Sequence, residues 1–331
     1  MQVLKTEFSN SGQKQIRRSL GCCGRMSIRP CRGTKPPGVI KMRRLQIKHV
    51  TTYQYAETVT LLPHKLLLRP REGHDIRIES AELIISPAYK LQWQRDVYDN
   101  AVAHATFLEP CSRLSIDSRV LIQHYDDQPL DFLVADYAVF FPFQYDAAER
   151  IDLGPYLSAI FNQDRPMLST WLRQFWYSGQ VVETYILLEW INKAIATGFT
   201  YQQREEPGVQ TPATTLNNRA GSCRDFATLF IEACRSLGLA ARFVSGYLYS
   251  PALPQGQGAT HAWSEVYLPG AGWKGFDSTT GQVVGNDHIT VSVGRHPESV
   301  PPVSGSFIAA PTANCQSPVM SVVVEVAEIP V

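Results

Sequence analysis

The sequence contains no long uncharged apolar segment, which argues against a membrane-spanning helix and a membrane partner. The best candidate for one, residues 130–143, is interrupted by Asp131 and Asp136, whereas a spanning helix needs about 18 or more consecutive apolar residues. Charged residues are also few, at 18% of the chain, and hydrophobic residues make up 44%. This balance excludes a wholly disordered or coiled-coil chain and predicts a globular protein of about two domains.

Cysteines are too few and too irregularly spaced for a disulfide framework. There are seven, an odd number, in a chain of 331 residues that can build a core without cross-links. Cys22, Cys23 and Cys31 lie close together, but no second cluster completes a zinc site around them. We therefore expect free thiols in a reducing, cytoplasmic setting.

Acidic residues are nearly absent from residues 1–44. This segment holds 11 of the 31 Lys and Arg residues and one acid, Glu7, whereas the rest of the chain holds 20 basic and 29 acidic residues. Because the body is acidic, it does not favour contact with phosphate backbones, and we expect no nucleic-acid partner. Residues 1–44 also lack the apolar region of a secretory signal. We interpret them as a basic flexible arm or as an extension before a true start at Met42.

Two periodicities divide the remaining chain. Alternating β-branched and aromatic residues with turn signals predict an N-terminal β-sandwich over residues 45–150. This region contains no nucleophilic cluster, and we expect it to be a support or recognition domain. Helical spacing begins at about residue 151. We therefore predict an α+β segment over residues 151–331 that ends in strands, with helices at 166–177 and 183–197.

The most informative segment begins at Gly221-Ser222-Cys223. Apolar residues at helical spacing follow it and Gly238 ends the pattern, which predicts a helix that Ser222 caps and Cys223 begins. At that position the helix dipole and unpaired N–H groups favour a thiolate and can bind a developing oxyanion. Cys234 lies eleven positions further along the same helix, about 16 Å away, and is assigned to packing.

A nucleophilic cysteine needs a base and a group that orients the base. Downstream of Cys223, two strand-like stretches flank a loop rich in Pro and Gly. If the loop spans the five residues 268–272, Tyr267 faces Trp273 and His261 becomes the diagonal neighbour of Asp277 on one face. A regular hairpin with a four-residue loop would separate the two side chains. The pairing therefore requires an odd loop or a bulge.

Taken in order, these separated blocks resemble the core of the transglutaminase-like superfamily. The upstream strands resemble the N-terminal region of its bacterial two-domain members, so that the resemblance covers roughly residues 45–331. The matching residues are Gly221-Ser222-Cys223-Arg224-Asp225-Phe226-Ala227, Leu237-Gly238-Leu239-Ala240-Ala241-Arg242, Gly246-Tyr247, His261-Ala262-Trp263-Ser264-Glu265-Val266-Tyr267, Gly272-Trp273, Phe276-Asp277-Ser278-Thr279 and, upstream, His49, Thr51, Tyr53, Tyr55 and His64.

The resemblance implies a papain-like α+β core without metal or cofactor, in which Cys223 is the nucleophile, His261 the base and Asp277 the orienting acid. Glu265 is expected to be a solvated or hydrogen-bonding strand residue and not a second acid. Bacterial two-domain members are usually described as cysteine proteases, so the implied activity is hydrolysis of an amide or peptide bond through a thioester acyl-enzyme. The implied partner is a peptide or protein substrate.

Three questions stay open at this level. The N–H group of Cys223 is the first candidate oxyanion donor, and Gln210 or Asn217 is a candidate for the second. Transamidation is an alternative, because it shares the thioester and differs in the nucleophile that resolves it. A non-enzymatic binding module is the other alternative, and the sequence says nothing about oligomeric state.

Overall fold

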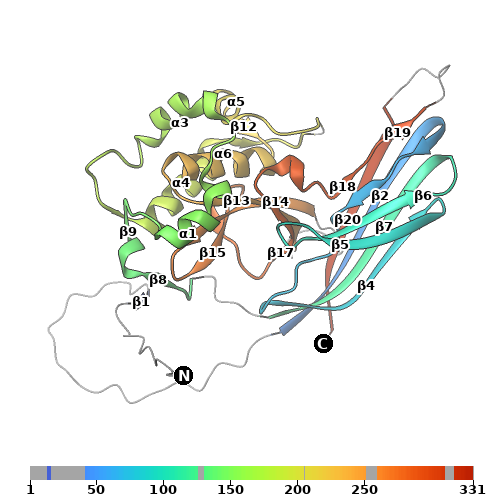
Figure 1. The fold of residues 1–331 in the computed structure, drawn as a ribbon, viewed down its shortest axis with the longest axis horizontal. Helices are drawn as coiled ribbons and strands as arrows, with labels where there is room; N and C mark the ends of the chain where they lie inside the picture. Colours follow the sequence, from blue (N-terminus) through green and yellow to red (C-terminus); the bar gives the residue numbers. More distant parts are fainter. Residues whose placement is uncertain are drawn as a thin grey trace, which may run out of the picture.

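The computed structural model describes residues 13–15, 42–125, 130–204, 206–250, 259–309 and 317–330. Most of the basic segment 1–44, with Cys22, Cys23 and Cys31, lies outside these described residues. Figure 1 shows a β-sandwich beside a core in which helices cover a sheet. Among the described helices, none is long and apolar enough to cross a membrane.

The sandwich contains two sheets, with strand orders β18-β3-β6-β5 and β19-β2-β7-β4. Alternate residues of both sheets meet in a buried apolar layer that includes Leu66, Ala103 and Leu114, as expected for two packed sheets. The strands are β2 (Met42–Leu61), β3 (His64–Leu66), β4 (Ile76–Ser86), β5 (Tyr89–Arg95), β6 (Ala101–Phe107) and β7 (Cys111–Tyr125). The β-sandwich predicted for this part of the chain is therefore present.

The C-terminal strands return to this sandwich. β20 (Val319–Ile329) pairs antiparallel with β2, while β18 (Val303–Ser304) and β19 (Phe307–Ile308) each extend one sheet. The sequence pattern grouped these strands with the segment 151–331, because periodicity identifies a strand but not the sheet it joins.

Some residues shortly before 150 were grouped with the sandwich by the sequence pattern but belong to the core. Phe132, Val134 and Phe141 pack among the helices of the core, although the sequence pattern grouped them with the sandwich. They lie in and beside β8 (Leu133–Ala135), the one-turn helix η1 (Asp136–Ala138) and β9 (Phe140–Phe141). These elements are too short for periodicity to assign.

The core is built on a five-stranded sheet with the order β16-β15-β14-β13-β17, in which all neighbours are antiparallel. Helix α6 packs against β13 and β14, and it contacts α3, α4 and α5. The bounds are β13 (Ala241–Leu248), β14 (Ala259–Leu268), β15 (Gly272–Asp277), β16 (Gln282–Val283), β17 (His288–Gly294), α3 (Arg165–Leu172), α4 (Thr184–Gly198), α5 (Pro212–Asn218) and α6 (Cys223–Ser236). The short α1 (Ala147–Asp152) and α2 (Gly154–Leu157) precede α3. This arrangement confirms the predicted α+β class.

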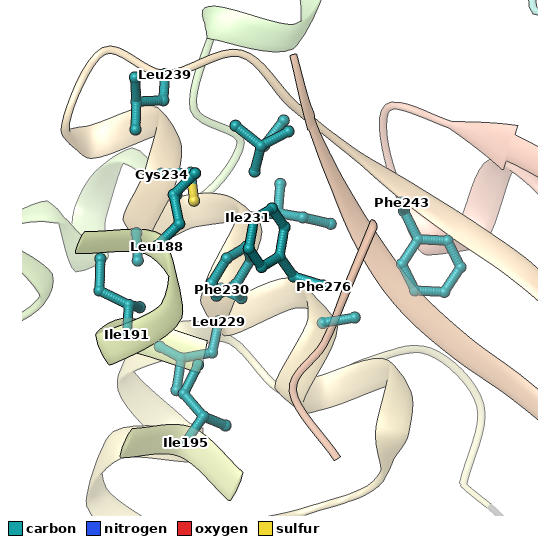
Figure 2. Packing of buried hydrophobic residues seen from close by; sticks show 14 of the residues in the cluster. Leu188, Ile191, Ile195, Leu229, Phe230, Ile231, Cys234, Leu239, Phe243 and Phe276 are labelled. Atoms are coloured by element: carbon teal, nitrogen blue, oxygen red, sulfur yellow. The ribbon is translucent and has the colours of Figure 1, made fainter. Parts of the chain in front are cut away.

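Helix α6 is fixed along its length by one apolar core. The Phe230 ring stacks on Phe276 of β15, with ring centroids 5.4 Å apart, and α4 covers the helix with Leu188 and Ile191 (Figure 2). Gly238, at φ +80°, ends the helix, because its N–H bonds back to the Arg235 carbonyl in a left-handed cap. Both ends of α6 thus fall where the sequence predicts them.

The sandwich packs on the sheet of the core through β13 and β17. Leu45 and Ile47 of the sandwich join Tyr247, Ile289 and other residues in one buried apolar cluster. Next to this cluster, the side-chain amide of buried Asn100 exchanges two hydrogen bonds with the backbone of Val293, at 2.8 and 2.9 Å. Asn100 therefore takes the place of a strand partner beside β17.

Phe230→Ala should lower the free energy of unfolding by about 3–5 kcal/mol, because it removes a fully buried ring and leaves a cavity under the sheet. Urea unfolding followed by circular dichroism measures the change. Phe140→Ala is the matched control, because the Phe140 ring is 57% exposed and such surface changes usually stay within about 0.5 kcal/mol. Similar losses in both variants would contradict the packing described for α6.

Candidate active site

Cys223 is the first residue of α6, and its side chain is only partly buried. Ser222 precedes it with extended backbone, and both the N–H and the Oγ of Ser222 donate to Asp225 Oδ2 at 2.8 Å. The N–H groups of the first helical turn have no partner within the helix. Cys223 therefore lies where the helix dipole and unpaired N–H groups favour negative charge.

Asp225 also anchors the segment that precedes α5. Its buried carboxylate accepts hydrogen bonds from Arg204 Nη1 at 2.8 Å and from the N–H of Gln210 at 2.7 Å. Burial would raise the pKa of Asp225, but the hydrogen bonds from Ser222, Gln210 and Arg204 lower it instead. The charged carboxylate therefore holds Arg204 and Gln210 beside the start of α6, a contact that sequence reasoning missed.

The second oxyanion donor stays a prediction. The side-chain oxygen of Gln210 accepts a hydrogen bond from Thr215 Oγ1 at 3.3 Å, and Asn217 is exposed on α5. This contact ties the Gln210 side chain to α5, and neither side chain is assigned to the oxyanion.

Strands β14 and β15 bring His261 and Asp277 together. Tyr267 pairs with Trp273, and Leu268 pairs with Gly272, so the connection has the odd register that sequence reasoning required. His261 Nε2 donates a hydrogen bond to Asp277 Oδ2 at 2.9 Å. Both side chains are buried, and that of Asp277 is completely inaccessible.

The charges at this pair favour an imidazolium and a carboxylate. Burial would lower the pKa of His261, but hydrogen bonds to Asp277 and Cys223 and the charges of both groups raise it to about 10. Because Nε2 faces Asp277, Nδ1 is the ring nitrogen left for Cys223. Burial likewise opposes ionisation of Asp277, yet hydrogen bonds from His261 and His288 and their charges hold its pKa well below the usual range.

Three further donors to the Asp277 carboxylate were not identified from the sequence. The Oδ2 atom accepts hydrogen bonds from Thr280 Oγ1 at 2.9 Å and from His288 Nε2 at 3.2 Å, and Oδ1 accepts one from the N–H of Thr279 at 2.9 Å. Thr279 and Thr280 lie in the turn that follows Asp277, so a local signal existed for them. His288 is the first residue of β17 and reaches the carboxylate only through the fold.

Within the described part of the chain, His261, Asp277 and His288 form a group whose potential metal-ligand atoms all lie within 4.8 Å of one another. In this arrangement each imidazole directs an Nε2–H at Asp277 Oδ2. A protonated nitrogen offers no lone pair to a metal ion. We therefore describe the group as a hydrogen-bond network, and the expected independence from metal stays a prediction.

Trp263 of β14 packs beside both imidazoles. It is completely buried, and its ring centroid lies 6.2 Å from that of His261 and 5.1 Å from that of His288. Gly246, which pairs with His261 across β13 and β14, makes room for it, because a Cβ at Gly246 would meet the Trp263 ring and the Ile289 carbonyl. The indole therefore limits the rotation of both rings.

Glu265, in the same strand, accepts a hydrogen bond from Arg242 Nε at 2.6 Å. Arg242 also lies over the ring of Trp273, 4.1 Å from its centroid. Glu265 is thus a hydrogen-bonding strand residue, as expected.

Comparison with known proteins adds independent evidence. The model of the bacterial transglutaminase-like N-terminal region matches residues 45–123, and that of the transglutaminase-like superfamily matches residues 183–278. An uncharacterized protein of Mycobacterium tuberculosis (strain ATCC 25618 / H37Rv) is 30% identical over 301 residues, which cover 86% of this chain and 92% of that protein. The chain belongs to the transglutaminase-like superfamily. An uncharacterized protein of Mycobacterium bovis matches with the same identity and coverage.

A solved structure shares the fold of this superfamily member over nearly its whole length. It carries the name "Putative Cysteine Protease from Cytophaga hutchinsonii" and superposes with a TM-score of 0.67 at 20% identity, covering 88% of this chain and 92% of that chain. This likeness establishes the two-part fold, in which a β region precedes the transglutaminase-like core.

Asp277→Asn should bring the pKa of His261 down from about 10 toward its ordinary value of about 6.5. The reason is that the carboxylate charge would no longer offset the lowering of this pKa by burial. A pH titration of the imidazole signals by ¹⁵N NMR measures this. His49 is an internal control in the same spectra, since burial lowers its pKa to about 4. A His261 that titrates near pH 6.5 in the unaltered protein would contradict the electrostatics described here.

The same pKa changes predict how stability depends on pH. Because the pKa of His261 is raised in the folded state, its contribution is fully present below about pH 6.5 and is lost as the pH rises toward 10. The lowered pKa of Asp277 makes its contribution present above about pH 4 and lost in acid. The stability difference between the unaltered protein and His261→Gln, from urea unfolding, should therefore be largest near pH 6. A difference that does not vary from pH 6 to 10 would refute the linkage.

Proposed function

We propose that this protein is a cysteine-dependent amide or peptide hydrolase in which Cys223 is the nucleophile, His261 the general base and acid, and Asp277 the orienting group. One observation carries the proposal. The buried imidazole of His261 is hydrogen-bonded to Asp277 at 2.9 Å, and Cys223 at the start of α6 is its other partner. A nucleophile, a base and an orienting acid in this order are what covalent acyl transfer requires.

In the first step, the Cys223 thiolate attacks the carbonyl carbon of the substrate and forms a C–S bond. The carbonyl electron pair moves to the oxygen, where the N–H group of Cys223 can stabilise the oxyanion. When the carbonyl reforms, the C–N bond breaks and the His261 imidazolium gives its proton to the leaving amine. The product is a thioester between the acyl group and Cys223.

In the second step, neutral His261 takes a proton from water, and the resulting hydroxide attacks the thioester carbon. The C–S bond then breaks, which releases a carboxylic acid and leaves the sulfur as a thiolate beside the imidazolium. Asp277 keeps its charge throughout and stabilises the imidazolium in both steps.

We propose a peptide or protein substrate, and two features support this choice. Cys223 is partly exposed whereas His261 and Asp277 are buried, so a polymer can present a carbonyl to the sulfur without entering the interior. A solved structure of the same fold also carries the name "Putative Cysteine Protease". We propose the cytoplasm as the compartment, because a nucleophilic thiol is required in its reduced form.

An acyl-enzyme should appear when the protein is incubated with a peptide library at neutral pH and examined by intact-mass spectrometry. The mass increase should map to Cys223 and be absent in Cys223→Ala. If an added lysine analogue becomes incorporated into the product, the thioester is resolved by transamidation. Release of the free acid alone establishes hydrolysis.

Alkylation by iodoacetamide separates an enzyme from a binding module without a known substrate. At pH 6.5 Cys223 should react about 10-fold or more faster than Cys111, because an ordinary thiol with a pKa of about 8.5 is only about 1% ionised there. Cys111 is the matched control, since it is also partly buried and burial raises its pKa. His261→Ala should abolish the difference. Equal rates for the two cysteines in the unaltered protein would favour a binding module.

A further inference from the structure

The reaction proposed above leaves one buried imidazole of the site unused. His288 is 9% exposed, and its Nε2 lies 3.2 Å from the same Asp277 oxygen that binds His261. Its other nitrogen, Nδ1, faces the N–H group of Gly285 at 3.5 Å. An N–H group aimed at Nδ1 favours the tautomer with the proton on Nε2. The ring is therefore oriented to donate to the carboxylate.

The neighbours of His288 restrict its ring further. Trp263 meets it edge to face, with an interplanar angle of 78° and a centroid separation of 5.1 Å. The ring centroid of His261 lies 6.1 Å away. The indole thus contacts both imidazoles that donate to Asp277, and a shift of one ring would disturb the other.

The backbone of His288 is held by a different part of the molecule from the backbone of Asp277. Ile289 and Val291, which follow His288 in β17, are buried in the cluster shared with the sandwich, and Asn100 binds the backbone of Val293. Asp277 instead ends β15. This separation matters, because only a donor anchored elsewhere can fix the carboxylate relative to the rest of the sheet.

The other donors to the carboxylate do not meet that condition. Thr279 and Thr280 belong to the turn that Asp277 begins, so they move with it. Ser278 is tied to Asn192 of α4 by a 2.8 Å hydrogen bond, which anchors the turn on the helix side but does not contact the carboxylate. Apart from His261 itself, His288 is the donor that comes from another strand of the sheet.

We infer that His288 is a positioning residue that acts through Asp277: from β17, which packs on the sandwich, it holds the carboxylate where it orients the His261 imidazolium. The inference deepens the proposed function and rests on it. Without the His288 donor, only the turn at Thr279 and Thr280 and His261 itself hold the carboxylate. Asp277 can then shift with its turn relative to the rest of the sheet, so that the imidazolium is less well supported and less thiolate forms at Cys223 in mildly acidic solution. Small displacements of an orienting group reduce rates strongly, by up to about 100-fold for about 1 Å.

The test compares His288→Phe, which keeps an edge-on ring beside Trp263 but removes the donor, with His288→Gln, whose amide nitrogen replaces Nε2 as a donor. The readout is the second-order rate of Cys223 alkylation by iodoacetamide. We expect His288→Phe to lower the rate about 10-fold at pH 6 and to leave it unchanged at about pH 10, where a thiol with an ordinary pKa of about 8.5 is ionised. His288→Gln should recover most of the loss. Melting temperatures confirm that each variant is folded.

A double-mutant cycle shows whether His288 acts through Asp277. Asp277→Asn alone should slow alkylation at pH 6, and adding His288→Phe should slow it no further. His64→Phe is the matched control: His64 is also a buried imidazole packed edge-on against an aromatic ring, Phe107, at 5.2 Å, but it lies in the sandwich. In the His64→Phe variant, Cys223 should be alkylated at the same rate as in the unaltered protein.

The outcomes separate this inference from the function on which it rests. If Cys223 in the unaltered protein reacts no faster than Cys111, the proposed function fails and the inference fails with it. If Cys223 is fast but His288→Phe is equally fast at pH 6, the inference alone is overturned. Equal slowing at pH 6 and pH 10, or a loss in His288→Phe that adds to that of Asp277→Asn, would show that His288 affects access or packing and does not position Asp277.

Discussion

The arrangement of the site depends on one buried carboxylate. Asp277 is inaccessible to solvent, and an unpaired charge in that position would be costly. Hydrogen bonds from His261, His288, Thr279 and Thr280 offset this cost. Because the carboxylate is fully satisfied in its ionised form, it can stabilise a neighbouring imidazolium without taking a proton from it. The chemistry proposed for Cys223 follows from that fixed negative charge.

The rest of the fold places the three groups from independent directions. Helix α6 presents Cys223 because an apolar core with Phe230 and Phe276 fixes the helix against the sheet. The odd register between β14 and β15 places His261 and Asp277 on one face. The sandwich contributes indirectly, since its apolar contact with β17 and the Asn100 hydrogen bonds position the strand that begins with His288. This gives the N-terminal region a role in shaping the site as well as a supporting one.

The features that the sequence predicted correctly are those with local causes. Ser222, Gly238 and the apolar spacing between them define α6, because caps and periodicity act over a few residues. The pairing of His261 with Asp277 was predicted from alternation along two strands on condition of an odd loop or a bulge, and the observed register meets that condition. The family resemblance then linked these segments, and the comparisons confirm the family.

The features that the sequence did not reveal depend on long-range pairing. A histidine at a strand start looks the same whether it is solvated or buried, so nothing local distinguished His288. Its contact with Asp277 arises only when β16 and the following residues carry the chain across the end of the sheet. The sheet that β20 joins was not predicted for the same reason. Its partner strand, β2, lies more than 260 residues earlier in the chain.

The pairing of β20 with β2 has a consequence for the order of folding. During synthesis β2 emerges early, but its partner on one side is the final described strand of the protein. The helices and the five-stranded sheet of the core are complete before that partner exists. The sheet that contains β2 therefore stays unfinished until β20 has been synthesised, and loss of β20 would leave a long, β-prone edge of β2 available for self-association.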